Sequence, residues 1–426
     1  MWESFDCADA YRPAKFPVTS RALAGLCVII ATFVLFTFCA CAPEQKKTDP
    51  LAGVSAEGVA TVVPAKPAST EPVEIRLLSA GDILQHMQVW MSGEREDGSR
   101  DYRHFFAHIA KELADQDVKV VNQETPMGGN ELGFTGFPTF NGPQEVGDAE
   151  AAAGFNVVLK ATNHVMDMGY AGLKSELAFW HENHPEVAVI GAHDPDDAST
   201  SVDDVYVFEK DGFRVALLNY TFDLNGYEDP EGAISLLEEG HVRSTMARAN
   251  ELADMVVVFP HWGEEYQLEP VDSQREWAAL FCELGADVII GGHPHVIEPV
   301  ELLAAPDGHL VPCFWSQGNF ISTSPDNDSL VGGLPKVTLR RDERGVCSVA
   351  AASFVPVVTH LGAGDEMTTY PLYAWTDELA ATNMRIGSFG MVSENTSCTP
   401  EWVSGFCADV LGDGFDSRTG VYELAV

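Results

Sequence analysis

The chain has 426 residues, of which 46% are hydrophobic, and it carries a formal net charge of -39. A chain of this length and apolar content can bury a sizeable core, so we expect one large folded domain or two ordinary ones. The negative charge repels the phosphates of nucleic acids and excludes them as partners. An adaptation to solubility or salt explains the same charge without any partner.

The first feature along the chain is an uncharged apolar stretch, Ala22–Ala40, preceded by basic residues. This pattern is typical of a signal sequence or of a single membrane anchor whose basic end stays inside the cell. Basic and acidic residues balance within residues 1–41, so the negative excess lies in the part that follows. The basic residues are Arg12, Lys15 and Arg21.

The apolar stretch ends at Ala40-Cys41, which is typical of a lipoprotein cleavage site where Cys41 takes the lipid. Bulky Phe38 and the adjacent Cys39 differ from that pattern, so an uncleaved anchor stays open as the alternative. Either reading predicts an extracytoplasmic protein that is attached to the membrane. Residues 42–72, which are rich in Pro, Ala, Ser and Thr, follow as a flexible linker.

From Val73 onward, short apolar runs alternate with helical stretches, which predicts an α/β sheet buried on both faces. Beyond Gly333 the pattern becomes strand-rich (336–339 and 346–358), which predicts a second sheet that completes the domain. The expected strands are 75–80, 118–121, 157–161, 187–190, 215–218, 255–259, 288–290 and 311–315. The expected helices are 102–114, 171–182, 240–253 and 273–284.

Several of the expected strands end in a polar group of the kind that binds metals. Because ligands collect outside the carboxyl ends of strands in open α/β sheets, these groups should converge although they span more than two hundred residues. A single histidine after a strand is more often structural, but five such motifs in order point to one metal site. The motifs are Gly81-Asp82, Asn122-Gln123-Glu124, Thr162-Asn163-His164, His261-Trp262-Gly263 and Gly292-His293-Pro294-His295.

With Phe140-Asn141-Gly142-Pro143, Asp167, Gly169 and Gly318-Asn319-Phe320, these motifs resemble the successive signatures of the CapA (PgsA-type) capsule and poly-γ-glutamate family. The resemblance covers residues 75–320. It implies a four-layer α/β/β/α fold of the metallophosphoesterase-like (calcineurin-like) type. It also implies a role in making, exporting or anchoring an anionic cell-surface polymer. The fold domain would then occupy residues 73–360, with residues 361–426 as a C-terminal extension that could pack on the domain.

Carried over residue by residue, the resemblance assigns a divalent metal site (Mn, Zn or Fe) and a catalytic histidine, His164. The implied metal ligands are Asp82, Glu124, Asn163, His261, His293 and His295, and the supporting residues are Asn122, Asp167 and Asn319. Two positions depart from the calcineurin-like pattern. Leu84 stands where that pattern has a histidine, and Asn122-Gln123-Glu124 stands where it has Gly-Asp.

The resemblance leaves three functional readings open. The first is a metal-dependent hydrolase in which an activated water attacks a phosphorus or amide carbonyl centre and His164 assists. The second is a non-catalytic subunit that uses the same cleft to handle polymer, with capsule-synthesis membrane proteins as partners. The third is a general exported phosphatase or phosphodiesterase that acts on a phosphorylated substrate.

Five cysteines lie downstream of the apolar stretch. In an oxidising compartment Cys398 and Cys407 could form a disulfide, and Cys313 could pair with Cys347 across neighbouring strands. Buried free thiols are the alternative.

The lipoprotein reading predicts that Cys41→Ser blocks maturation, because the lipid and the cleavage both depend on that thiol. We expect the variant to accumulate as an unprocessed precursor that takes up no labelled fatty acid, whereas Cys39→Ser should mature normally. Normal processing and lipid labelling of the Cys41 variant would favour the uncleaved anchor.

Overall fold

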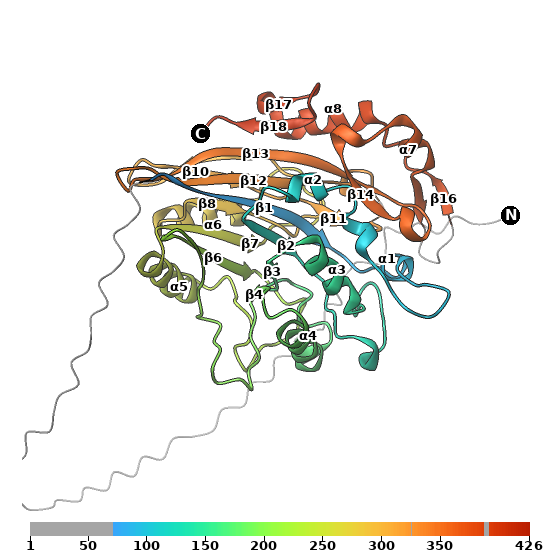
Figure 1. Cartoon of the computed structure of the whole chain (residues 1–426), viewed down its shortest axis with the longest axis horizontal. Coiled ribbons are helices and arrows are strands. Elements are labelled where there is room, and N and C mark those ends of the chain that lie inside the picture. Colours follow the sequence, from blue (N-terminus) through green and yellow to red (C-terminus); the bar gives the residue numbers. More distant parts are fainter. Residues whose placement is uncertain (1–70, 325, 387–391) are drawn as a thin grey trace, which may run out of the picture. The chain divides into compact units, whose positions relative to one another are not determined.

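The computed structural model describes residues 71–324, 326–386 and 392–426, which fold into two large β-sheets with helices on their outer faces (Figure 1). The predicted signal or anchor segment, Cys41 and nearly all of the linker lie outside these residues. Within the described ranges, no helix is both long enough and apolar enough to cross a membrane.

The larger sheet has ten strands and is built around β1 (Val73–Ile83). On one side of β1 the strands β2, β3 and β4 run parallel to it, and on the other side β12 (Val331–Arg341) and β13 (Cys347–His360) continue the sheet antiparallel. Its other strands are β2 (Val118–Asn122), β3 (Val157–Leu159), β4 (Ala188–Ile190), β11 (Asn319–Ile321), β14 (Thr368–Pro371), β17 (Phe415–Asp416) and β18 (Val421–Leu424).

The second sheet has six strands in the order β5-β6-β7-β8-β10-β9. Its four central strands are parallel, and β5 and β9 pair antiparallel at the two edges. The strands are β5 (Tyr206–Lys210), β6 (Phe213–Thr221), β7 (Met255–His261), β8 (Val288–Ile290), β9 (Val300–Ala304) and β10 (Leu310–Phe314). A separate small sheet pairs β15 (Met384–Ile386) with β16 (Val392–Asn395).

Helices α3 and α4 lie beside β2–β4, and α8 lies beside β17 and β18 at the other end of the larger sheet (Figure 1). The α-helices are α1 (Met87–Ser92), α2 (Ala110–Leu113), α3 (Glu145–Ala153), α4 (Gly169–Asn183), α5 (Glu239–Leu252), α6 (Asp272–Glu283), α7 (Asp377–Thr382) and α8 (Pro400–Leu411). Short 3-10 turns are η2 (Arg103–Phe106), η3 (Asn130–Leu132), η4 (Asp328–Leu330), η5 (Gly364–Glu366), η6 (Leu372–Ala374) and η7 (Gly412–Gly414).

The two sheets pack face to face, as the alternation of side chains along β6 shows. Val215 and Leu217 join the core that also contains β1, β2 and β12, whereas Ala216 and Leu218 join a separate core with α5 and α6. Side chains of a strand point to opposite faces in turn, so one face of β6 meets the larger sheet and the other meets helices. Burial of both faces explains why these strands read as continuous apolar runs.

Two sequence-based expectations about the elements were wrong. The strands beyond Gly333 do not form the second sheet, because β12 and β13 pair beside β1, and the second sheet is built from residues 206–314 instead. The helix expected over 102–114 is broken into η2 and α2. The Thr368 hydroxyl donates to the carbonyl of His104, which diverts that carbonyl from a regular helical ladder.

The disulfide expectations were also wrong, since all five cysteines of the described residues are free thiols. Cys313 lies in β10 and Cys347 in β13, so they belong to different sheets and not to neighbouring strands. Cys398 and Cys407 are both buried, and burial raises the pKa of Cys398 to about 11 and that of Cys407 to about 12. Such thiols stay protonated and behave as small apolar groups.

A buried carboxyl, Glu298, lies in the loop between β8 and β9. It accepts a hydrogen bond of 2.7 Å from Gln274 Nε2 of α6, and its second oxygen has no partner among the described residues. Burial raises the pKa of Glu298 to about 8, although the bond from Gln274 opposes the shift. The neutral form therefore fits the folded protein best.

Replacement of Glu298 by Gln should make the protein less sensitive to alkaline pH. The raised pKa means that Glu298 favours the folded state fully below its ordinary value of 4.5, and that this contribution is lost as the pH rises through about 8. Since one pKa unit corresponds to about 1.4 kcal/mol, we expect Glu298→Gln to be more stable than the parent by about 2–4 kcal/mol at pH 9 and little changed at pH 5. Chemical denaturation at both pH values measures this. The same gain in Glu301→Gln, which alters a half-buried carboxylate of β9, would contradict the assignment.

Candidate metal centre

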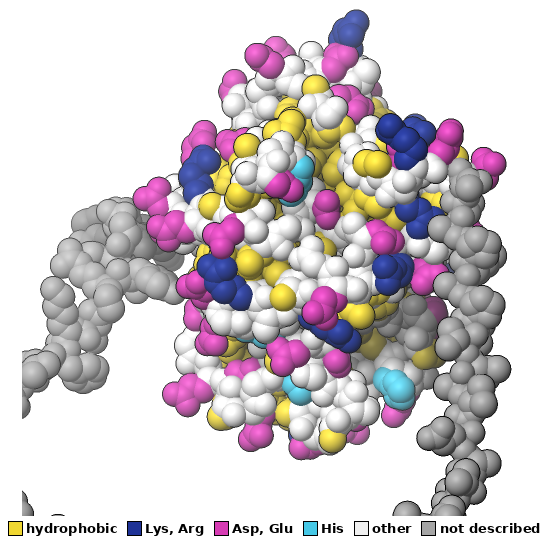
Figure 2. All heavy atoms as spheres, turned by 90° about the vertical axis from the view of Figure 1, so that its left-hand side faces the viewer, with side chains coloured by type: hydrophobic (Ala, Val, Ile, Leu, Met, Phe, Trp, Pro, Cys, Tyr) yellow, Lys and Arg dark blue, Asp and Glu magenta, His cyan; other side chains and the backbone are white. Residues whose placement is uncertain are grey.

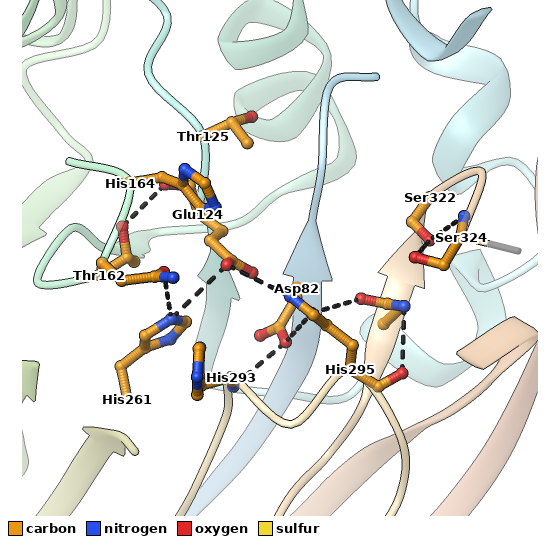
Figure 3. A network of polar contacts seen from close by, with 12 residues as sticks. Asp82, Glu124, Thr125, Thr162, His164, His261, His293, His295, Ser322 and Ser324 are labelled. Carbon is orange, nitrogen blue, oxygen red and sulfur yellow. Dashed lines mark hydrogen bonds and ion pairs between the residues drawn. The ribbon is translucent and has the colours of Figure 1, made fainter. Parts of the chain in front are cut away.

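Strands of both sheets end at one place, and their polar side chains point toward one another there (Figure 3). β1, β2 and β3 of the larger sheet bring carboxylates and amides, whereas β7 and β8 of the second sheet bring imidazoles. A bridge between His261 and Gly292 joins the two imidazole-bearing loops. The predicted site residues found here are Asp82, Asn122, Glu124, Asn163, His164, Asp167, His261, His293, His295 and Asn319.

One group of potential ligands consists of Asp82, Glu124 and His295, whose ligand atoms lie within 4.8 Å of one another. His295 Nδ1 lies 3.2 Å from Asp82 Oδ2, and His295 Nε2 lies 3.8 Å from Glu124 Oε1. Two amides support the group: Asn122 Nδ2 donates to Asp82 Oδ1 over 2.7 Å, and Asn319 Oδ1 lies 3.1 Å from His295 Nδ1. Two of the three supporting residues predicted from the sequence, Asn122 and Asn319, thus contact ligand candidates directly.

A second group consists of Glu124, His261 and His293, again with ligand atoms within 4.8 Å of one another. His261 Nε2 lies 3.6 Å from Glu124 Oε1 and 3.0 Å from Asn163 Oδ1. Glu124 therefore belongs to both groups of potential ligands.

The side chains of this centre fit a divalent metal ion. Both carboxylate oxygens of Glu124 and the Nδ1 atom of His293 are buried without a hydrogen-bond partner among the described residues. Buried polar atoms nearly always have a hydrogen-bond partner, so three unpaired atoms in one centre indicate a bound ligand that accepts their lone pairs. Imidazole and carboxylate donors together suit a divalent transition metal.

Glycine keeps the centre open between these donors. A Cβ added at Gly292 would stand 2.9 Å from Asp82 Oδ1 and 3.3 Å from Asn122 Nδ2, so it would fill the space between the two sheets. The histidines that follow have left-handed backbones, with φ of 98° at His293 and 60° at His295. Conformations of this kind cost energy and concentrate at functional sites, where the surrounding structure enforces them.

The charges of the centre follow from burial and from the mixture of groups. Burial opposes ionisation of Glu124, but the imidazoles of His295 and His261 outweigh it and lower the pKa of this carboxyl. Burial, aided by the neighbouring imidazoles His261 and His295, holds the pKa of His293 well below its ordinary value. The imidazole therefore stays neutral and keeps a nitrogen lone pair available for a metal ion. Burial also acts to lower the pKa of His295, but Glu124 and Asp82 overcome it and raise that pKa to about 9.

His164 belongs to neither group and forms a dyad with Asp167. Its Nδ1 lies 2.8 Å from Asp167 Oδ2, and this carboxylate also accepts the backbone N–H of Phe140 over 2.8 Å. The Phe140 ring packs edge-on against the imidazole of His164 with 4.8 Å between centroids. Phe140 of the Phe140-Asn141-Gly142-Pro143 motif thus contacts both members of the dyad.

Sequence reasoning does not assign two residues of the centre: it passes over Asn225 and leaves His86, four residues after Asp82, open. Asn225 contacts both Asn163 Nδ2 and His164 Nδ1 at 3.3 Å, and His86 packs against Phe140. The signal for Asn225 was present, because β6 is also a buried strand that leads into a polar turn. Leu84, which stands at the position of the missing histidine, is buried and takes no part in either ligand group.

Fold and site together define an α/β protein of two packed sheets with a buried carboxylate–imidazole centre of metal-binding type. A model of the family described as "Bacterial capsule synthesis protein PGA_cap" matches residues 76–324. The chain belongs to this family of bacterial capsule synthesis proteins.

Two curated relatives share the aligned region. The chain is 33% identical over 181 residues to "PGA biosynthesis protein CapA" of Bacillus subtilis (strain 168), which covers 39% of this chain and 42% of that protein. It is 32% identical over 187 residues to "Capsule biosynthesis protein CapA" of Bacillus anthracis, which covers 42% of this chain and 43% of that protein. The match therefore spans about two-fifths of the length of these relatives.

Solved structures resemble the chain more distantly. A putative 5'-nucleotidase from Staphylococcus aureus aligns with a TM-score of 0.41 and 17% identity over 67% of this chain and 54% of that one. A 5'-nucleotidase from Candida albicans aligns with a TM-score of 0.35 and 12% identity over 61% and 46% of the two chains. Likenesses at this level define neither the fold nor the activity.

Replacement of His293 by Ala should remove metal uptake at one position and leave the fold intact. His293 Nδ1 has no partner to lose, and its neutral ring forms no ion pair, whereas a metal ligand is lost. We expect metal affinity to fall at least about tenfold and the metal-free proteins to unfold at nearly the same temperature. A chelator should lower the melting temperature of the parent more than that of the variant.

Metal content and thermal unfolding, each with and without chelator, measure this prediction. His193→Ala is the matched control, because His193 bonds only to backbone carbonyls outside the centre. Equal metal content in the parent and in the His293 variant would mean that His293 is structural.

Proposed function

We propose that this chain is a metal-dependent hydrolase of capsule biosynthesis that acts on an anionic cell-surface polymer such as poly-γ-glutamate. The observation that carries the proposal is Glu124, a carboxylate shared by two ligand groups, both of whose oxygens lack a partner among the described residues. A dyad of His164 and Asp167 lies beside it. A structural polar cluster needs neither an unsatisfied carboxylate nor an oriented histidine.

The proposed fold name is the metallophosphoesterase-like α/β/β/α sandwich, supported by the two packed sheets with helices outside them. The proposed metal is Mn, Zn or Fe, and the side chains that would hold it are Asp82, Glu124, Asn163, His261, His293 and His295. Divalent ions held there would supply the positive charge that polarises the scissile group and lowers the pKa of an attacking water.

The protein's own residues would handle the proton and the orientation. An Nδ1–H of His164 that donates to Asp167 leaves Nε2 as the nitrogen that exchanges a proton with the substrate. Asp167 fixes the ring because its carboxylate is itself held by the N–H of Phe140. Asn163, which precedes His164 in the chain, donates to Asn225 Oδ1, and its own Oδ1 lies 3.0 Å from His261 Nε2, so the loop that carries His164 is held beside His261.

We further propose that the protein works outside the cytoplasm, attached to the membrane through its N-terminal segment, with capsule-synthesis membrane proteins as partners. The apolar stretch 22–40 and the linker that follows support this placement. Carboxylates are scattered over the face drawn in Figure 2 with fewer Lys and Arg among them, so an anionic polymer would approach a repulsive surface. Metal ions in the centre would offset that repulsion locally.

Replacement of His164 by Gln should separate chemistry from metal binding. General acid–base assistance contributes about 10²–10⁴-fold, so we expect kcat to fall by that factor while metal content stays at the parent level. The assay follows Mn²⁺-dependent cleavage of poly-γ-glutamate and of bis(p-nitrophenyl) phosphate by the full chain. His193→Gln is the control.

The outcomes distinguish the alternatives. Turnover of the phosphodiester without any effect on the polymer would indicate a general exported phosphodiesterase. Metal-dependent retention of the polymer without cleavage of either substrate would indicate a non-catalytic polymer-handling subunit, and the hydrolase proposal would be rejected.

A further inference from the structure

A lysine lies fully buried directly behind the metal centre. Lys160 follows β3, its side chain has no solvent exposure, and its Nζ donates to the carbonyl oxygens of Gln123 at 2.9 Å and Thr125 at 3.4 Å. Those two residues flank Glu124 in the chain. A buried ammonium group is costly unless it is fully paired, so its place behind this segment needs an explanation.

The same segment is held by a second donor from the loop after β3. Thr162 Oγ1 donates to the carbonyl oxygen of Glu124 over 2.8 Å. Three consecutive carbonyls, those of Gln123, Glu124 and Thr125, thus accept bonds from Lys160 and Thr162. The backbone that carries the shared carboxylate is thus held through its carbonyl groups, which leaves the carboxylate oxygens of Glu124 free of these bonds.

Lys160 is balanced by a carboxylate from the helical layer. Its Nζ lies 3.0 Å from Glu176 Oε2 of α4, and both side chains are fully buried. The same oxygen of Glu176 accepts the backbone N–H of Met127 over 3.0 Å, which extends the support past Glu124. A further buried acid, Glu150 of α3, is kept neutral, because burial and the nearby Glu176 raise its pKa well above the ordinary value.

We propose that the buried pair Lys160–Glu176 is a positioning device that sets the metal affinity of the centre through the backbone of Glu124. The inference rests on the proposed function and deepens it, since it concerns the same ions. A pair that served only stability would be replaceable by uncharged side chains without consequence for metal binding. A pair that positions the shared carboxylate holds a metal ligand in place without contacting the metal, and the loss of such a contact typically weakens metal binding by about 10–100-fold.

The test compares two matched double variants of the full chain. Lys160→Met with Glu176→Gln removes both charges and leaves an acceptor for Met127. Lys336→Met with Glu112→Gln removes the ion pair between β12 and α2, which is 2.9 Å long and involves none of the ligand candidates. Mn²⁺ is titrated into each protein, free Mn²⁺ is read by electron paramagnetic resonance, and thermal unfolding of the metal-free proteins is recorded.

We expect the Lys160 and Glu176 variant to bind Mn²⁺ at least tenfold more weakly than the parent, or to lose one ion, while the control variant keeps parental affinity. Parental affinity in a folded Lys160 and Glu176 variant would overturn the inference and leave the proposed function standing. Absence of Mn²⁺ uptake by the parent would overturn both.

If the double variant does not fold, Thr162→Val decides the question. It removes only the hydroxyl that holds the Glu124 carbonyl and leaves every charge in place. A severalfold loss of Mn²⁺ affinity at unchanged melting temperature supports the inference that the held backbone of Glu124 sets metal affinity. Parental affinity overturns that inference.

Discussion

The arrangement of the centre depends on keeping the buried carboxylate of Glu124 ionised. Burial alone would favour its neutral form, and neither of its oxygens has a hydrogen-bond partner among the described residues. The imidazoles of His295 and His261, 3.8 and 3.6 Å away, outweigh burial and lower the pKa of this carboxyl. A carboxylate held in this way is stabilised by electrostatics while its lone pairs stay available, which is what a metal ligand requires.

The compensation works only because the two sheets meet with their carboxyl ends at the same place. The larger sheet supplies the acids and the second sheet supplies the imidazoles, so each contact between them also joins the sheets. Asn219 of β6 also connects the two sheets. Its Oδ1 accepts the N–H groups of Lys160 and Ala161 at 3.0 and 2.6 Å, and its Nδ2 donates to the carbonyl of Phe259 over 2.9 Å. The loop after β3 is thereby tied to β6 and β7, and Lys160 is directed toward Glu124.

The sequence predicted what depends on periodicity and on position after a strand. Buried parallel strands read as apolar runs, and the polar group after each run gave the ligand candidates, which the structure brings together. Sheet membership was not predictable in this way, because the apolar pattern of β12 would be the same whether this strand extended the first sheet or began a second one. Lys160 was hidden for a related reason: it lies within the expected strand 157–161, and the apolar pattern does not show that this lysine is buried or that it pairs with Glu176 of α4.

The chain's charge explains why a metal centre would also govern access to an anionic substrate. With a net charge of -39, the protein repels polyanions at long range, and Asp82 and Glu124 add two negative charges inside the centre. Of the three imidazoles, His293 stays neutral because its pKa is held low, so it offsets none of that charge. Divalent ions bound by these side chains would make the centre positive while the surface stays negative. Substrate binding and metal binding would then be thermodynamically linked. The loss of Lys160, which acts on the ions through the backbone of Glu124, would then also change the affinity for the substrate, although Lys160 does not contact it.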